Sequence, residues 1–311
     1  MDRFDRTNPA QGLAGPRYPG TFLLALREAL AGLAIEARAW KHSSVVCVDA
    51  HGLEQEIGLE NLYRRLRREP RASWPGLLKS ILGSVPADAA DQPKDLHEVA
   101  DRLLVRFGVP VVPENPDAAV WSREIVEDHL WVSLVVDYPN SMSYVTEKQV
   151  AESGEDGAMW FERALANLQA LSPPECIELV HEEAGLLQAH VGDAYDSSRA
   201  LVLDALMPGH EENGFYVIVP GRDQLLFVPI NEQTLMAAAW LRAIAFKMFQ
   251  EMPYPISPEV FWVRGGIWHV FTIETNGDDL IVRPPPEFAE VVERLRGDED
   301  IPEDDSPPLS L

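Results

Sequence analysis

The spacing of apolar positions along the chain follows two periods, which predict helices and strands in irregular alternation. Helix-forming residues with a broad apolar face predict a helix over Thr21–Leu33, and a valine-rich run predicts a strand over Ser43–Val48. Pro220-Gly221 predicts a type II turn within the hairpin Gly214–Pro229. A Gly-Gly pair predicts a second hairpin over Val260–Ile273.

The same periods predict the remaining elements. The helix expected over Thr234–Glu251 is apolar almost all round, so we expect it to be buried on more than one side. The other predicted helices are Leu59–Arg68, Trp74–Val85, His97–Val105 and Ala158–Leu171. The other predicted strands are Ile35–Trp40, Glu54–Gly58, Asp128–Asp137, Met142–Thr146, Cys176–Val180 and Leu186–His190.

Helices and antiparallel hairpins interleave without the strand–helix–strand repeat of a parallel sheet, so the predicted fold class is α+β. A chain of 311 residues exceeds the usual size of a single core. We therefore expect two α+β units of helices packed on antiparallel hairpin-built sheets. Their predicted limits are a flexible leader 1–18, an N-terminal unit 19–116, a C-terminal domain 117–285 and an acidic disordered tail 286–311.

The composition excludes several classes of protein. A formal net charge of −24 disfavours binding to nucleic acid or to an anionic membrane surface. The amino terminus lacks the order of a signal peptide, and no apolar run approaches the length of a membrane span. Cys47 and Cys176 each lie in an apolar run, which predicts buried thiols and a cytoplasmic protein rather than a disulfide framework.

The candidate site is a polar stretch, Gly192–Arg199, which precedes the apolar helical run Ala200–Leu206. It is typical of a helix start, with Asp193 placed to cap the helix and Asp196 resembling the acidic member of a capping box, and the spacing of Asp196 and Arg199 also allows them to pair across one turn. A helix N-terminus with carboxylate, hydroxyl and guanidinium groups also favours an anionic ligand or a peptide contact. The residues of that hypothetical site are Asp193, Tyr195, Asp196, Ser198, Arg199, Arg222 and Asp223.

Three strings support a family resemblance. Arg163–Leu168, Gly192–Arg199 and Val219–Leu225 occur in an order that resembles the YtpQ-like family of uncharacterised bacterial proteins. The resemblance covers roughly Leu130–Phe271. The earlier segment Leu59–Tyr63 lies at a similar place to a segment of that family, but its resemblance is weaker. It implies an α+β domain and brings the two later strings into one unit, but it implies no activity.

No pattern predicts a metal, a cofactor or a nucleophile. The histidines lack a pair at the spacing of a helical zinc site, and no Cys-x-x-Cys accompanies them: His181, His190, His210 and His269. Ser197 and Ser198 lack the Gly-x-Ser-x-Gly elbow of hydrolases. We therefore assign no catalytic residue.

One basic cluster occurs in the otherwise acidic chain: Arg64, Arg65, Arg67, Arg68 and Arg71. It predicts either a solvated helix face or a docking site for the acidic tail.

Two classes of function remain open for this sequence. The first is a non-catalytic binding or regulatory protein that offers a groove or sheet face to a protein or peptide partner. The second is a hydrolase or transferase for a small anionic substrate, with Asp196 or Asp223 as acid or base and Arg199 or Arg222 as anion clamp.

Overall fold

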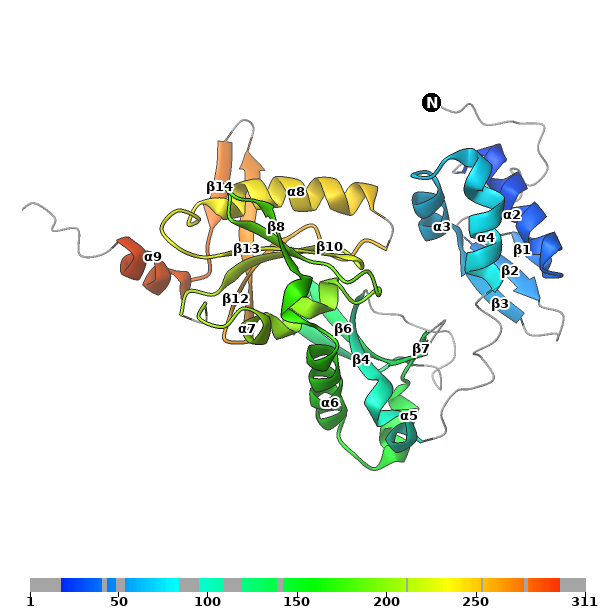
Figure 1. Ribbon diagram of the computed structural model, residues 1–311, viewed down its shortest axis with the longest axis horizontal. Coiled ribbons are helices and arrows are strands. Elements are labelled where there is room, and N and C mark those ends of the chain that lie inside the picture. The colour runs from blue at the N-terminus through cyan, green and yellow to red at the C-terminus, as the bar shows by residue number, and fades with distance from the viewer. Residues whose placement is uncertain are drawn as a thin grey trace, which may run out of the picture.

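The computed structural model describes residues 18–40, 44–48, 54–83, 95–108, 119–138, 142–210, 212–252, 254–276 and 279–296. Its helices and three antiparallel sheets confirm the predicted α+β class (Figure 1). The leader up to residue 17 and the tail from residue 297 lie outside the described residues, so the predicted docking of the tail does too.

The N-terminal unit packs three helices on an antiparallel β1-β2-β3 meander. Tyr18, predicted to belong to the leader, is instead fully buried, with its ring 5.8 Å from those of Phe22 and Tyr63. Cys47 is buried in the same core, as predicted. The elements are α2 (Gly20–Gly32), β1 (Glu36–Trp40), β2 (Ser44–Val48), β3 (Glu54–Gly58), α3 (Leu59–Leu66), the 3-10 helix η1 (Arg71–Ser73) and α4 (Trp74–Gly83).

The next segment departs from the sequence prediction. Residues Leu96–Arg102 form a 3-10 helix, η2, and Leu103–Gly108 form strand β4, where a helix over His97–Val105 was expected. β4 pairs with β6 from Leu103 opposite Val136 onward. The apolar residues at the start of β4 are buried by this distant pairing, which overrides local helix propensity. β4 therefore belongs to the core of the later elements and not to an N-terminal unit that ends at residue 116.

A four-stranded sheet of β4, β5, β6 and β7 holds the predicted hairpin of β6 and β7. Strand β5 and helix α5 were not predicted; α5 begins with a capping box formed by Thr146 and Gln149. Helix α6 packs on β4. The bounds are β5 (Ser122–Val126), β6 (Leu130–Asp137), β7 (Met142–Tyr144), α5 (Glu147–Ser153) and α6 (Gly157–Ala170).

A seven-stranded sheet in the order β14-β13-β12-β10-β11-β9-β8 separates two cores. Alternate residues of β10 point to opposite faces: Phe215 and Val217 join the core with α6 and η5, while Tyr216 and Ile218 join the core with α8 and α9. The bounds are η4 (Pro174–Cys176), β8 (Ile177–His181), β9 (Leu186–Ala189), η5 (Ser197–Val202), α7 (Leu203–Leu206), β10 (Phe215–Gly221), β11 (Gln224–Pro229), α8 (Ala237–Glu251), β12 (Val260–Arg264), β13 (Ile267–Asn276), β14 (Asp279–Arg283) and α9 (Phe288–Arg296).

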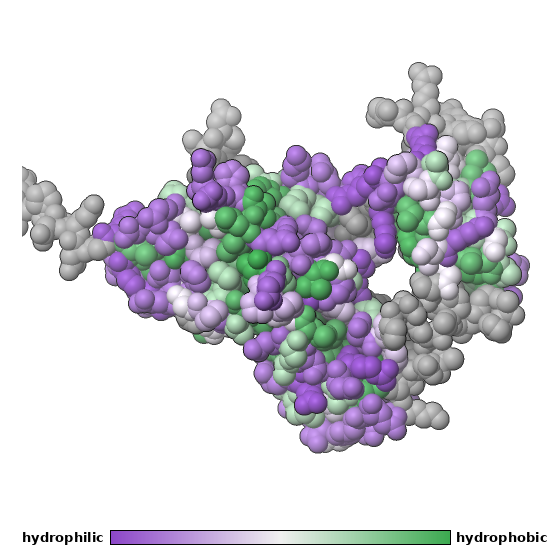
Figure 2. All heavy atoms as spheres, viewed as in Figure 1, coloured by the Kyte–Doolittle hydropathy of each residue, from purple (hydrophilic) through white to green (hydrophobic). Residues whose placement is uncertain are grey.

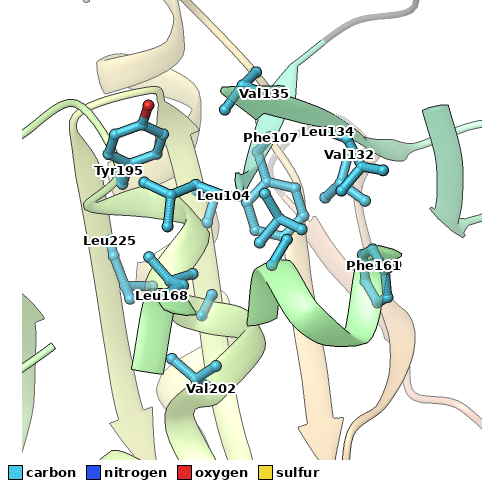
Figure 3. Close-up of a cluster of buried hydrophobic side chains, with 14 of the residues drawn as sticks. Leu104, Phe107, Val132, Leu134, Val135, Phe161, Leu168, Tyr195, Val202 and Leu225 are labelled. Carbon is cyan, nitrogen blue, oxygen red and sulfur yellow. The ribbon is translucent and has the colours of Figure 1, made fainter. Parts of the chain in front are cut away.

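The core on the α6 side of this sheet supports the candidate site. Figure 3 shows Leu168 of α6, Val202 of η5 and Leu225 of β11 grouped together, with Leu104 of β4 beside Tyr195. All four aliphatic side chains are buried. The loop and 3-10 helix that carry the polar stretch are therefore held between the two sheets.

Two predictions about helices are wrong. Helix α8 buries one face only, formed by small and aliphatic residues, and Phe246 on it is 49% exposed. Residues Phe288–Arg296, predicted to be disordered tail, form helix α9. Phe288 is buried among the rings of Tyr216, Trp262 and Phe271, at centroid distances of 5.8, 5.2 and 5.0 Å. This one aromatic anchor gives a short, charged helix a place in the core.

Of the two predicted hairpin turns, one is confirmed and the other is wrong. The β12–β13 turn at Gly265-Gly266 is confirmed, and both glycines have positive φ, 55° and 74°, as a type I′ turn requires. The type II turn at Pro220-Gly221 is wrong, because β10 continues through Gly221, which pairs with Gln224. The turn residues are therefore Arg222 and Asp223.

The N-terminal unit contacts the end of α8 through two arginines of the basic cluster. The Nη2 group of Arg67 donates to the carbonyl of Glu251 at 2.8 Å, and that of Arg68 donates to Sδ of Met252 at 2.7 Å. Carbonyls at a helix C-terminus lack partners within the helix and attract cations. Part of the cluster therefore caps a helix end.

Within the described part of the chain, no helix has both the length and the apolar character to cross a membrane.

Candidate functional site

The candidate stretch forms a tight loop between β9 and η5. Gly192 and Ala194 have positive φ, 81° and 70°, which turns the chain back on itself. Asp193 Oδ1 accepts from the N–H of Tyr195 at 3.0 Å, and Asp196 Oδ1 accepts from the N–H of Val191 at 2.8 Å. Neither carboxylate bonds to an N–H of η5, so the predicted helix caps are instead clamps on the preceding loop.

Arg199 is fully buried and is held by carboxylates of its own loop. Its Nη1 and Nη2 groups donate to the two oxygens of Asp193 at 2.8 and 2.6 Å, and Nη1 lies 3.2 Å from Asp196 Oδ1. Such a bidentate pair is strong and specific in geometry. Burial lowers the pKa of Arg199, but the two carboxylates more than compensate and raise it.

Asp193 connects this buried pair with solvent. Its side chain keeps 32% of its surface exposed, whereas the Arg199 side chain keeps none. Burial raises the pKa of Asp193, but the hydrogen bond from Arg199 and the N–H of Tyr195 outweigh burial and lower it below its ordinary value. Because the Arg199 guanidinium is paired with these carboxylates and buried, it does not face solvent as a residue that binds an anionic ligand would.

Tyr195 links the loop to the four-stranded sheet. Its ring lies in the core, and Figure 3 shows its hydroxyl directed away from the aliphatic cluster. That hydroxyl donates to Oδ1 of Asp137, the last residue of β6, at 2.7 Å. Burial and the Asp137 carboxylate raise the pKa of Tyr195. Burial also raises the pKa of Asp137, against a smaller lowering by the Tyr195 hydrogen bond. Asp137 was not predicted, because its partner lies far away in sequence.

His190 is a second polar group that the sequence did not single out for binding or catalysis. Its Nδ1 atom lies 3.2 Å from Oδ2 of Asp196; the histidine side chain is 55% exposed and that of Asp196 is fully buried. A buried carboxylate at one ring nitrogen orients an imidazole and selects its tautomer. The signal in the sequence was only a histidine six residues before an aspartate, which is too common to be specific.

Ser198 has a structural partner. Its Oγ atom accepts from the N–H of Phe107 at 3.1 Å, so η5 satisfies a donor on the outer edge of β4. Covering an edge strand in this way prevents it from pairing with another chain. The neighbouring Ser197 Oγ is buried and has no partner among the described residues.

Arg222 and Asp223 form a separate pair at the β10–β11 turn. The Nε and Nη2 groups of Arg222 donate to the two oxygens of Asp223 at 2.6 and 2.7 Å, and the guanidinium lies 3.9 Å from the ring centre of Tyr254. A main-chain hydrogen bond joins the turn to η5, since the N–H of Ser197 donates to the carbonyl of Arg222 at 3.2 Å. No hydrogen bond or ion pair that the structure describes joins Arg222 or Asp223 to Arg199.

The seven-stranded sheet ends in an open edge at β8. The N–H of Ile177 donates to the carbonyl of Pro174 in η4, but among the described residues no loop or side chain outside the sheet hydrogen-bonds to the backbone of the rest of the strand, Glu178–His181. Leu179 and Val180 on this strand are 58% and 48% exposed. Figure 2 shows hydrophobic surface beside hydrophilic surface in the region of β8. β4, the edge of the neighbouring sheet, is covered by Ser198, so the contrast between the two edges is clear.

The surroundings of β8 along the chain are acidic. Four exposed glutamates flank or belong to the strand, and the chain has no lysine or arginine between Arg163 and Arg199: Glu175, Glu178, Glu182 and Glu183. A local surplus of one sign of charge attracts partners of the opposite sign.

Comparisons with family models, curated proteins and solved structures find no match to this chain. The YtpQ-like resemblance therefore stays a prediction. In the described ranges, no group of three or more histidine, cysteine, aspartate or glutamate side chains is arranged to hold a metal ion. Within the described residues, the geometry presents internally paired polar groups around η5 and, at β8, a strand edge that carries two exposed apolar side chains.

Proposed function

We propose that this chain is a non-catalytic cytoplasmic binding or regulatory protein that engages a protein or peptide partner at the edge strand β8. The observation that carries the proposal is the exposure of Leu179 and Val180 on an uncovered edge. An unpaired strand edge is a template for an added strand, whose main-chain hydrogen bonds provide affinity. Natural proteins usually protect such edges.

The charged groups near η5 fit this proposal because they are used internally. Arg199 is fully buried against Asp193 and Asp196. Arg222 is bound by Asp223 and stacked on Tyr254. A small anionic substrate would have to displace these carboxylates. The cluster instead holds the loop and η5 against the sheets. Two buried free thiols, Cys47 and Cys176, fit a reducing compartment.

The test is a selection of displayed random peptides on the full chain. We expect enriched peptides whose binding is lost in Leu179→Asp, because an aspartate there removes apolar contact and adds to the local acidity. Ile267→Asp is the matched control, since Ile267 is 62% exposed on a different strand. The proposal fails if no sequence is enriched, or if the enriched peptides bind Leu179→Asp as tightly as the natural chain.

One observation favours the alternative of a hydrolase or transferase for a small anionic substrate. The exposed His190, oriented by buried Asp196, has the arrangement of a general base. If this alternative holds, the full chain turns over activated phosphate or carboxylate esters, and His190→Gln abolishes the turnover without changing stability. Absence of turnover, together with Leu179-dependent peptide capture, would leave the binding function.

A further inference from the structure

We infer that the partner of β8 is an extended basic segment of another protein, with alternating apolar and basic residues, which adds to the seven-stranded sheet as a further antiparallel or parallel strand. The inference rests on the proposed function and names the chemistry of its partner. It follows from the faces on which the side chains of β8 lie and from the charges around the strand.

The pairing of β8 with β9 determines which side chains share a face. Ile177 and Leu179 lie opposite Ala189 and Leu187, on the face toward the α6 core. Glu178 lies opposite Gln188 on the other face, and its Oε2 accepts from the Gln188 Nε2 group at 2.7 Å. An added strand continues both faces. Its residues beside Ile177 and Leu179 are therefore apolar, and the residue beside Glu178 carries the opposite charge.

The length of the added strand is limited. The register of β8 against β9 shifts between Leu179 and His181, so Val180 lies at an irregularity. Such a bulge bends and twists a strand and shortens the straight edge available for pairing. The partner aligns chiefly with Ile177–Leu179, while the acidic residues Glu182-Glu183 beyond the bulge attract its basic side chains.

A second copy of this chain is a poor occupant of the same edge. An antiparallel pair of β8 strands aligned over Ile177–Leu179, the regular part of the edge, would set Glu178 of one copy directly opposite Glu178 of the other. Like charges directly opposite on paired strands are destabilising. No lysine or arginine between Arg163 and Arg199 can offset this repulsion within the segment. The charges favour a basic partner over self-association.

The experiment measures binding of blocked synthetic peptides to the full chain by calorimetry at low and at physiological ionic strength. The probes are a peptide of alternating valine and lysine, its valine–glutamate counterpart, and the valine–lysine peptide with alternate peptide bonds N-methylated. We expect only the first to bind, more weakly at higher salt because screening shortens the range of exposed charges to about 8 Å. Glu178→Lys/Glu182→Lys should weaken it about three- to tenfold.

The matched control is Glu287→Lys/Glu293→Lys, which makes the same change of charge at two exposed positions near α9 and should leave the affinity unchanged. Equal binding of the valine–glutamate peptide would overturn the basic partner, and equal binding of the N-methylated peptide would overturn strand addition. If display selects Leu179-dependent peptides that are acidic or uncharged, the proposed function stands and this inference is wrong. If it selects none, the proposed function itself fails.

Discussion

At the scale of single residues, the buried ion pair of Arg199 is the feature whose role the sequence predicted only in part. Asp196 and Arg199 were predicted to pair across one turn, and they do. The stronger bidentate partner, Asp193, is six residues away and reaches Arg199 only because Gly192 and Ala194 turn the loop at positive φ. The spacing of residues along the sequence predicts contacts across a helical turn, but it does not predict contacts that form because a loop folds back on itself.

Arg199→Ala should destabilise the protein by about 3–5 kcal/mol, because it leaves two carboxylates, one of them fully buried, without their counter-charge. Arg199→Lys should recover part of this loss, since an ammonium keeps the charge but not the bidentate geometry. Urea denaturation provides the measurement. Arg102→Ala, at an exposed arginine, is the control and should change stability by under about 1 kcal/mol. A small loss for Arg199→Ala would mean that water replaces the guanidinium.

The Asp137 carboxyl should make stability depend on pH. Its pKa is raised in the folded protein, chiefly by burial, so the folded state binds its proton more tightly than the unfolded state does. The contribution of Asp137 to the free energy of unfolding is therefore complete below about pH 3.9, the pKa of an aspartate in the unfolded chain. It is lost as the pH rises through the higher pKa of Asp137 in the folded protein.

Asp137→Asn stays neutral and can still accept from the hydroxyl of Tyr195. We expect the stability of this variant relative to the natural chain to rise between about pH 3 and pH 7. Urea titrations across that range measure the difference. Asp101→Asn, at an exposed aspartate, serves as control. A relative stability of Asp137→Asn that does not change with pH would contradict the raised pKa.

At the scale of elements, the hydrophobic pattern predicted those helices and strands whose partners lie close in sequence. The hairpins of β6–β7 and β12–β13 and the helix α6 were predicted near their observed limits. β4 was missed, because the apolar run Leu103-Leu104-Val105 suits a helix or a strand and its pairing with β6 decides between them. α9 was missed because its charged residues hide the single aromatic anchor Phe288.

Helix α9 provides a test at this scale. Deleting residues 286–311 removes Phe288, which is buried against the rings of Tyr216, Trp262 and Phe271, and should cost about 3 kcal/mol or more. Deleting only 297–311 should leave the melting temperature within a few degrees, because that segment is mostly acidic residues and proline, with Ile301, Leu309 and Leu311 as its large apolar residues. Thermal melting of the two truncated chains makes the comparison. Equal melting temperatures would show that α9 adds no stability.

At the scale of the whole molecule, the cores define units that composition could not. One core holds only residues from Tyr18 to Leu82, and the other two hold only residues from Leu96 onward. The sequence placed the boundary near residue 116 because three prolines lie within Pro110–Pro116. The cores instead place the boundary between Leu82 and Leu96.

Two fragments test this boundary. A fragment 95–311 keeps η2 and β4, so both of its cores are complete, and it should fold and melt cooperatively without the N-terminal unit. A fragment 117–311 lacks Leu103, Val105 and Phe107, which are buried, and exposes the edge of β6 that β4 covers. The free-energy cost of losing several large buried side chains at once exceeds the usual free energy of unfolding of a domain. We therefore expect the shorter fragment to be unfolded or aggregated by circular dichroism and size-exclusion chromatography. A cooperative melt of 117–311 would restore the boundary that the sequence favoured. If 95–311 does not fold, then Arg67 and Arg68 of the N-terminal unit stabilise the end of α8 by more than two exposed hydrogen bonds usually contribute.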